Sequence, residues 1–201
     1  MPQLLGASGP HSKALGALAN ELFVPDRLAL LRRIAHTDPL DYRELVNFDQ
    51  SIGGLGLAWI ERREADPFGP YGIVDRDVFR PLQYCEAYFR MNPHESEWLA
   101  RALVEMSCAH IEALVKRIAG LPFVPYGSAL FSWAVRRKLA TQTFEHLHRF
   151  GTIYNSAKHD FSHPPGTHRF SIPDAVLAYS IARRLATDLY AAANVGTPLW
   201  P

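Results

Sequence analysis

LATQTFEHLHRFGTIYNSAKHD, residues 139–160, is the stretch of the sequence that most clearly indicates the fold. Large apolar residues recur in it at spacings of three and four, which is the period of one face of an α-helix. They are Phe144, Leu147, Phe150 and Tyr154. One step round the same helix lies a polar row, made of His148, Thr152, Asn155 and His159. A helix through this segment carries a packing face and, beside it, an edge of hydrogen-bonding side chains.

The same helical period runs through most of the chain. Proline-free runs cover residues 40–66, 94–121, 126–163 and 174–197, and the last three are clearly periodic. Alternating β-branched runs bounded by turn residues are nearly absent. We therefore expect an all-α fold, an antiparallel helical bundle of four or more helices with short extra N-terminal helices. Its long helices are expected near residues 94–119, 129–159 and 174–195, and a bend is expected in the second of them between Trp133 and Leu139.

Capping and turn residues place several helix ends. Short helices are expected at residues 12–23 and 27–36, and Asp41 is expected to start a third. Further along, residues 51–63 carry an apolar helical face. Residues 66–74 indicate a loop, followed by a helix from about residue 77 to 91 with Pro81 in its first turn. Asn92 is expected to cap the helix that Gly120 ends. A length of 201 residues suits one helical-bundle domain, residues 1–201, with a core at 75–195 and an N-terminal helical extension at 1–74.

Composition indicates a globular chain with no global charge preference. Apolar residues make up 48% and charged residues 20%, and the net charge is +1, so neither disorder nor overall attraction to nucleic acid or membrane follows. The chain has no apolar run long enough for a membrane span and no secretory leader, so we expect a cytoplasmic protein without a membrane partner. Cys85 and Cys108 stand in apolar surroundings without a CxxC spacing and are expected to be core thiols.

Two predictions concern polar residues within helical stripes. His110 lies in the apolar stripe of the helix at 94–119, so we expect a hydrogen-bonded core histidine. Arg183, Arg184 and Asp188 are expected on the face of the last helix that meets water or a partner.

A basic patch with reactive side chains follows residue 136. Between Arg136 and Phe170, six Lys and Arg residues stand against two acidic residues, a local charge of +4. Within it, Asn155, Lys158 and His159 form a minimal set for cleaving RNA through its own 2′-hydroxyl. A histidine takes and gives a proton, a cation neutralises phosphate, and an amide orients either group. The structural alternative is that these residues only satisfy the carbonyls at the helix end.

The segment Tyr154-Asn155-Ser156-Ala157-Lys158-His159 resembles the late-helix motif of the HEPN superfamily (higher eukaryote and prokaryote nucleotide-binding domains). These are small α-helical bundles, often found in toxin–antitoxin, abortive-infection and RNA-processing systems. The family pattern is Arg, a polar residue, three variable residues and His. Asn155 matches the polar position and His159 the histidine, whereas Tyr154 stands in place of the arginine. The resemblance covers these six residues and a similar long-helix layout over residues 94–195.

This resemblance implies a protein that binds RNA or a nucleotide, or a metal-independent ribonuclease of a defence or toxin–antitoxin system, with no cofactor. It implies that His159 acts as the general acid or base and that Asn155 assists it. Lys158 would hold the phosphate. The residues implied to line the substrate approach are Arg149, His148 and Tyr154. A homodimer with facing motif helices and a cognate protein partner are also implied by resemblance.

Two other functions fit the same residues. The first is a non-enzymatic helical interaction protein in which the motif only ends a helix. The second is a metal-dependent helical-bundle hydrolase. Its ligands would come from His148, His159, Asp160, His163 and Glu105, although the sequence contains no HExxH motif.

Overall fold

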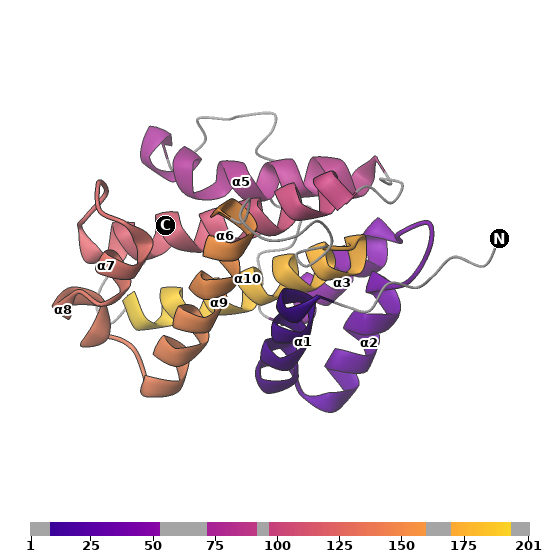
Figure 1. Cartoon of the computed structure of the whole chain (residues 1–201), viewed down its shortest axis with the longest axis horizontal. Coiled ribbons are helices and arrows are strands. Elements are labelled where there is room, and N and C mark those ends of the chain that lie inside the picture. The colour runs from indigo at the N-terminus through magenta and orange to yellow at the C-terminus, as the bar shows by residue number, and fades with distance from the viewer. Residues whose placement is uncertain (1–8, 53–71, 92–96, 160–169, 194–201) are drawn as a thin grey trace.

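The computed structural model describes residues 9–52, 72–91, 97–159 and 170–193. In these ranges the chain forms nine helices and no strand, and the helices pack against one another, which confirms the all-α class (Figure 1). Helix α10 (Ile172–Ala193) runs through the middle of the molecule. Helices α5 (Gly72–Arg90) and α6 (Glu97–Ala119) lie on one side of it in this view, and α9 (Thr141–His159) crosses it.

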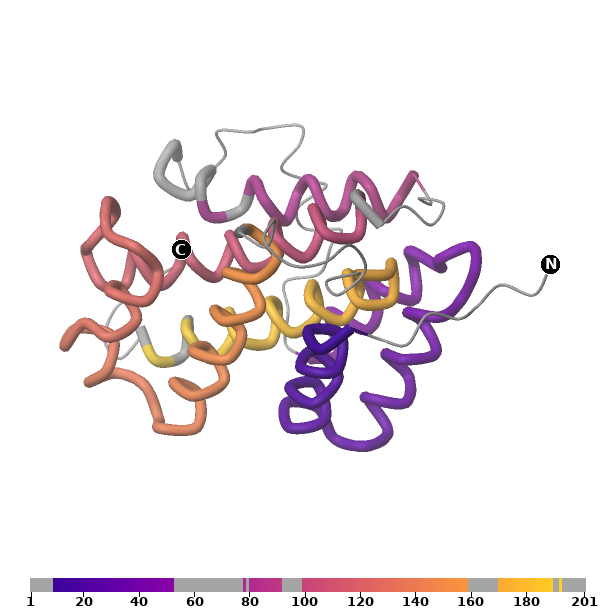
Figure 2. Tube along the Cα trace, in the orientation of Figure 1, coloured from indigo at the N-terminus to yellow at the C-terminus, as the bar shows by residue number. Residues whose placement is uncertain are grey.

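Three short helices precede these: α1 (Pro10–Leu22), α2 (Pro25–Ala35) and α3 (Tyr42–Ser51). Proline opens α1 and α2, and the Asp41 carboxylate caps α3 by accepting from the backbone N–H groups of Arg43 (2.9 Å) and Glu44 (3.1 Å). The predicted starts of α2 and α3 are therefore confirmed, whereas α1 begins at Pro10, two residues before the expected range of 12–23. Helix α1 lies beside α9 and α10 (Figure 2), and the buried residues of α1–α3 join those of the longer helices in one apolar core.

Gly120 ends α6 as its sequence position predicts. It adopts a left-handed conformation with φ of 66°, which glycine tolerates without steric cost. The Gly120 and Leu121 N–H groups then donate back to the carbonyls of Arg117 (3.1 Å) and Lys116 (3.0 Å). The last turn of α6 is thereby satisfied before the chain turns away.

A single helix over residues 129–159 is not what the structure shows. The chain instead forms α7 (Tyr126–Leu130), then α8 (Trp133–Arg136), and only then α9. The reason is tertiary packing: the Tyr126 hydroxyl donates to the Leu147 carbonyl at 2.8 Å, so α7 packs on the side of α9 and does not extend it.

Helix α5 begins at Gly72, so the loop expected over residues 66–74 is wrong for its last three residues. Pro81 consequently lies inside the helix and not in its first turn. The buried row Val78, Leu82, Cys85 and Phe89 packs against α6, and this burial outweighs the missing proline N–H. The helical face expected beyond Ile52 and the Asn92 cap lie outside the described residues.

Arg183 faces the core, so its predicted exposure to water was wrong. Its side chain is 2% exposed, and its Nε and Nη2 donate to the two carboxylate oxygens of Asp49 at 2.7 and 3.1 Å. Nearby, the Tyr179 hydroxyl donates to Oε1 of Glu86 at 2.9 Å, and burial raises the pKa of Glu86 well above its usual value. Polar groups from α3, α5 and α10 thus meet inside the apolar core.

The other buried groups agree with prediction. His110 is fully buried, and its Nδ1 lies 2.7 Å from the Val78 carbonyl. Burial lowers the pKa of His110 to about 3, so the ring is neutral and Nδ1–H is the donor. Cys85 and Cys108 are buried free thiols, and burial raises the pKa of Cys85 to about 12.

Candidate functional site

The described side chains of the polar row predicted on α9, those of His148, Thr152 and Asn155, face solvent. Leu147, Phe150 and Ile153 turn into the core, which leaves the opposite side of the helix exposed. We call this side the exposed edge of α9; its described members are His148, Thr152, Asn155 and Lys158. The edge of hydrogen-bonding side chains expected from the sequence is therefore accessible to a partner molecule.

A backbone carbonyl in the last turn of α9 accepts a hydrogen bond from a side chain of another helix. Nε of Arg101, in α6, donates to the Ala157 carbonyl at 2.6 Å. The side chain of Asn155 makes no hydrogen bond to any residue that the structure describes. The alternative in which Asn155 serves the helix end therefore gains no support from these contacts. His159 is the final residue of α9, and its side chain, like Asp160 and His163, lies outside the described part.

Tyr154 lies beneath Lys158 and is buried. The Lys158 Nζ stands 5.4 Å from the centre of the tyrosine ring, which is a cation–π contact. The Tyr154 hydroxyl hydrogen-bonds to Glu112 of α6; burial, with this bond, raises the pKa of Tyr154. Glu112 also pairs with Lys116 at 2.5 Å. Tyr154 thus offers the flat face of its ring to Lys158, while its hydroxyl is engaged with α6.

Arg149 points toward α1 and not along the exposed edge of α9. Its Nη1 donates to Oε2 of Glu21 at 2.6 Å, and Nε2 of His146 lies 3.3 Å from the same oxygen. The Arg149 hydrogen bond, with the pairing to His146, lowers the pKa of Glu21. The structure therefore separates Arg149 from the other residues predicted to contact substrate.

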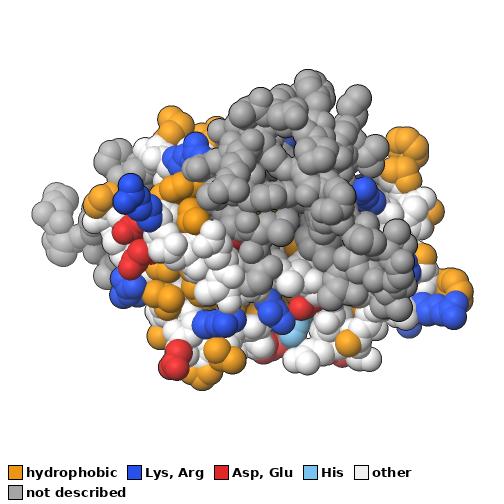
Figure 3. All heavy atoms as spheres, turned by 180° about the vertical axis from the view of Figure 1, so that it is seen from behind, with side chains coloured by type: hydrophobic (Ala, Val, Ile, Leu, Met, Phe, Trp, Pro, Cys, Tyr) orange, Lys and Arg blue, Asp and Glu red, His pale blue; other side chains and the backbone are white. Residues whose placement is uncertain are grey.

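Aromatic and cationic side chains gather where α8 meets the start of α9. The Phe131 ring makes edge contacts with Phe144 (5.0 Å between centroids) and His148 (5.4 Å). The Arg137 guanidinium lies 4.8 Å from the Trp133 ring centre, and Trp133 is 72% exposed. Figure 3 shows hydrophobic and Lys or Arg side chains together at the right-hand edge, where α8 lies in that view.

We call this region the basic–aromatic surface and define it by six exposed residues: Phe131, Trp133, Arg136, Arg137, Lys138 and His148. Over residues 126–158 the sequence holds five Lys and Arg residues and one acidic residue, Glu145, a local charge of +4. The charge was predicted from the sequence, but Phe131 and Trp133 were missed as site residues. The signal was present, because Phe131 and Trp133 stand five and three residues before the first of three consecutive cations.

The metal-site alternative finds no ligand cluster in the described residues. In that part of the chain no group of three or more His, Cys, Asp and Glu side chains is placed to hold a metal ion. His148 packs on Phe131 at the start of α9, whereas Glu105 lies on α6.

Comparisons of the chain with protein-family models, with curated proteins and with solved structures find no match. Within the described ranges, no helix has both the length and the apolar character needed to cross a membrane.

Proposed function

We propose that the basic–aromatic surface, continued along the exposed edge of α9, binds single-stranded RNA. The observation that carries this proposal is the exposed Trp133 ring beside the Arg137 guanidinium. An accessible indole face gives an unpaired base a surface on which to stack, and neighbouring cations neutralise the phosphates on either side.

Single strands fit this surface better than duplexes. Bases in a duplex stack on one another and hide the faces that an aromatic ring would contact. Arg136, Arg137 and Lys138 closely follow Trp133 along the chain, and Lys158 adds a cation at the far end of α9. Because every base has a flat face, we expect little dependence on RNA sequence. The HEPN resemblance supports RNA over other anionic partners.

The stacking contribution is tested by measuring the affinity of the full chain for a fluorescein-labelled single-stranded RNA by fluorescence anisotropy. We expect Trp133→Ala to weaken binding by about 1–3 kcal/mol, the usual value of one base–aromatic stack. Tyr84→Ala is the matched control, because Tyr84 is also an exposed aromatic residue but lies on α5. Equal effects of the two changes, or no binding by the unmodified chain, would count against the proposal.

A second proposal is that the last turn of α9 cleaves the bound RNA without a metal ion. It is favoured by the exposure of Asn155 and Lys158 on the turn that ends at His159. The 2′-hydroxyl attacks the adjacent phosphorus and the bond from phosphorus to the 5′-oxygen of the next nucleotide breaks, which gives a 2′,3′-cyclic phosphate and a free 5′-hydroxyl. His159 acts in proton transfer, taking the proton from the 2′-hydroxyl or giving one to the 5′-oxygen, and Lys158 stabilises the phosphate charge. The homodimer and the cognate protein partner implied by the HEPN resemblance remain predictions.

Cleavage is followed with labelled RNA in the presence of a chelator. We expect the unmodified chain to produce a 2′,3′-cyclic phosphate end, and we expect His159→Ala to abolish the product while RNA affinity is retained. His36→Ala is the control, because His36 is an exposed histidine at the end of α2. RNA binding without any cleavage product would leave the protein a non-enzymatic binder.

A further inference from the structure

A groove of about 370 Å³ lies between α5 and α6, and none of the six residues of the basic–aromatic surface lines it. The two helices lie side by side in Figure 1 and are antiparallel. The Val78 carbonyl of α5 contacts His110 of α6, whereas Cys85, seven residues later on α5, contacts Leu103, seven residues earlier on α6. Small side chains on α6 leave room for the groove. Its lining includes Arg80 and Tyr84 from α5 and Ala102, Glu105, Met106 and Ala109 from α6.

Helix α5 has a second apolar face besides the buried row that packs on α6. Tyr84, Tyr88 and Met91 follow one another at spacings of four and three, so they lie on one side of the helix. Their side chains are 49%, 37% and 76% exposed. A helix at the surface of a monomer usually has one apolar face and a polar face opposite it. Exposed tyrosine and methionine at helical spacing beside a groove are typical of a surface that another helix covers.

The groove carries one cation and one anion, Arg80 on the α5 wall and Glu105 on the α6 wall. Within the ranges that the structure describes, neither side chain forms an ion pair or a hydrogen bond. Both are partly buried, so each gains from an opposite charge that a partner brings.

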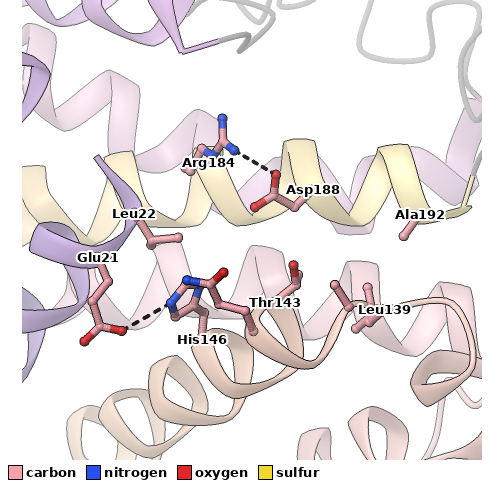
Figure 4. Close-up of a pocket in the computed structure, with 10 residues that line it drawn as sticks. Glu21, Leu22, Leu139, Thr143, His146, Arg184, Asp188 and Ala192 are labelled. Atoms are coloured by element: carbon pink, nitrogen blue, oxygen red, sulfur yellow. Dashed lines mark hydrogen bonds and ion pairs between the residues drawn. The ribbon is translucent and has the colours of Figure 1, made fainter. Parts of the chain in front are cut away.

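The cavity between α1, α9 and α10 differs from the groove in this respect (Figure 4). In that cavity Oε2 of Glu21 lies 3.3 Å from Nε2 of His146, and Oδ1 of Asp188 pairs with Nη2 of Arg184 at 3.1 Å. These charged groups are engaged within one chain. The two charges of the α5–α6 groove are instead available to a second molecule.

We infer that the α5–α6 groove, with the exposed apolar face of α5, is the interface between two copies of this chain. A two-fold dimer uses the same surface of both chains, so that surface must complement itself. The groove meets this condition, because Arg80 pairs with Glu105 of the partner subunit and the same contact is made a second time across the axis. A strongly acidic or strongly basic partner gains no such advantage at a surface whose two charges cancel.

This dimer differs from the one that the HEPN resemblance implies, in which the motif helices face each other. No residue of α9 lines the groove. The inference is also independent of the RNA proposal, since RNA binding requires only the basic–aromatic surface and the exposed edge of α9.

The test is the mass of the full chain in solution, measured by analytical ultracentrifugation. At about 100 μM chain, above the micromolar end of the affinity range of ordinary interfaces, we expect the unmodified chain to be a dimer. Arg80→Glu and Glu105→Arg, each measured alone, bring like charges together at both contacts. We expect each change to weaken self-association by about tenfold or more.

Mixing these two variants is the sharpest arm of the experiment. One chain then carries two carboxylates in its groove and the other carries two guanidinium groups, so opposite charges meet again at both contacts. We expect the equimolar mixture to form a heterodimer at least as stable as the unmodified dimer. The matched controls are Arg27→Glu on α2 and Glu145→Arg on α9, which reverse exposed charges outside the groove and are expected to leave the dimer unchanged.

Tyr88→Ser tests the apolar part of the interface without a change of charge, and we expect it to weaken the dimer. RNA affinity of the same Tyr88→Ser sample is expected to be unaffected, so loss of the dimer and loss of RNA binding are separate results. A monomeric unmodified chain would leave this face to a different protein and overturns the inference. A dimer that neither groove variant weakens, or a mixture that stays dissociated, overturns it as well.

Discussion

The buried ion pair between Arg183 and Asp49 is the residue-scale feature with the largest expected effect on stability. Arg183→Met removes the bidentate cationic partner of a buried carboxylate, so we expect it to lower the free energy of unfolding by about 3–5 kcal/mol. Arg33→Met is the control, because it breaks an exposed bidentate pair with Glu44 (2.9 Å), which solvent screens, so we expect a much smaller loss of stability. Urea unfolding measures both. Equal losses of unfolding free energy in the two variants would show that burial does not increase the contribution of the Arg183–Asp49 pair to stability.

Glu86 gives a pH dependence whose sign follows from its raised pKa. The folded state keeps a proton that the unfolded chain releases at about pH 4.3, so Glu86 contributes stability at low pH that is lost as pH rises toward its folded pKa. We expect Glu86→Gln to gain stability relative to the unmodified chain as pH rises above about 4.3 and until it passes the folded pKa of Glu86, with a slope of at most about 1.4 kcal/mol per pH unit. The amide oxygen that this change introduces can still accept from the Tyr179 hydroxyl. Parallel stability curves for the two proteins would refute a protonated Glu86.

Arg183 and His146 show what the sequence could and could not reveal at this scale. Arg183 follows Val176 and Tyr179 at helical spacing, so periodicity alone places it inward. Its positive charge favoured the opposite prediction, because the compensating Asp49 lies 134 residues away in the chain. His146 likewise lies on the inner side of α9, and its partner Glu21 belongs to α1. Partners so distant in sequence are visible only once the helices are packed.

At the scale of single helices, two glycines are expected to respond in opposite directions to alanine. A Cβ at Gly151 in α9 would lie 2.8 Å from Cδ1 of Tyr126 and nearer still to Cε1. The Tyr126 ring is held by its hydrogen bond to Leu147, so we expect Gly151→Ala to cost about 1–3 kcal/mol. Gly16 in α1 has nothing within 4 Å of such a Cβ, so Gly16→Ala is expected to add about 0.5–1 kcal/mol. Thermal and urea unfolding distinguish these outcomes, and a stabilised Gly151→Ala chain would contradict the packing of α7 on α9.

Helix ends were predictable where local chemistry sets them and not where packing does. Gly120, Asp41 and Pro25 mark their helix ends in the sequence, and the structure agrees. The start of α5 at Gly72 depends on contacts with α6, which no local pattern encodes. The bend expected between Trp133 and Leu139 is a complete break between α8 and α9 in the structure, with Tyr126 of α7 packed on the side of α9. The exposed edge of α9 was predicted because an amphipathic period fixes both faces of a helix at once.

At the scale of the whole molecule, the basic–aromatic surface lies at one end and α1–α3 lie toward the other (Figure 1). This separation allows equal charge changes to be compared at two places on the same protein. Arg136→Glu/Arg137→Glu/Lys138→Glu reverses three cations of the surface. Lys13→Glu/Arg27→Glu/Arg43→Glu reverses three exposed cations, one in each of α1, α2 and α3.

The measurement that tests the central claim most directly is the salt dependence of single-stranded RNA affinity in these two variants and the unmodified chain. Each phosphate contact on a single strand contributes about 0.7 to the slope of log affinity against log salt concentration. Reversal of the three surface cations is expected to reduce that slope by about 2 and to weaken binding, whereas reversal on α1–α3 leaves the slope unchanged. Equal slopes in all three proteins would contradict RNA binding at the basic–aromatic surface.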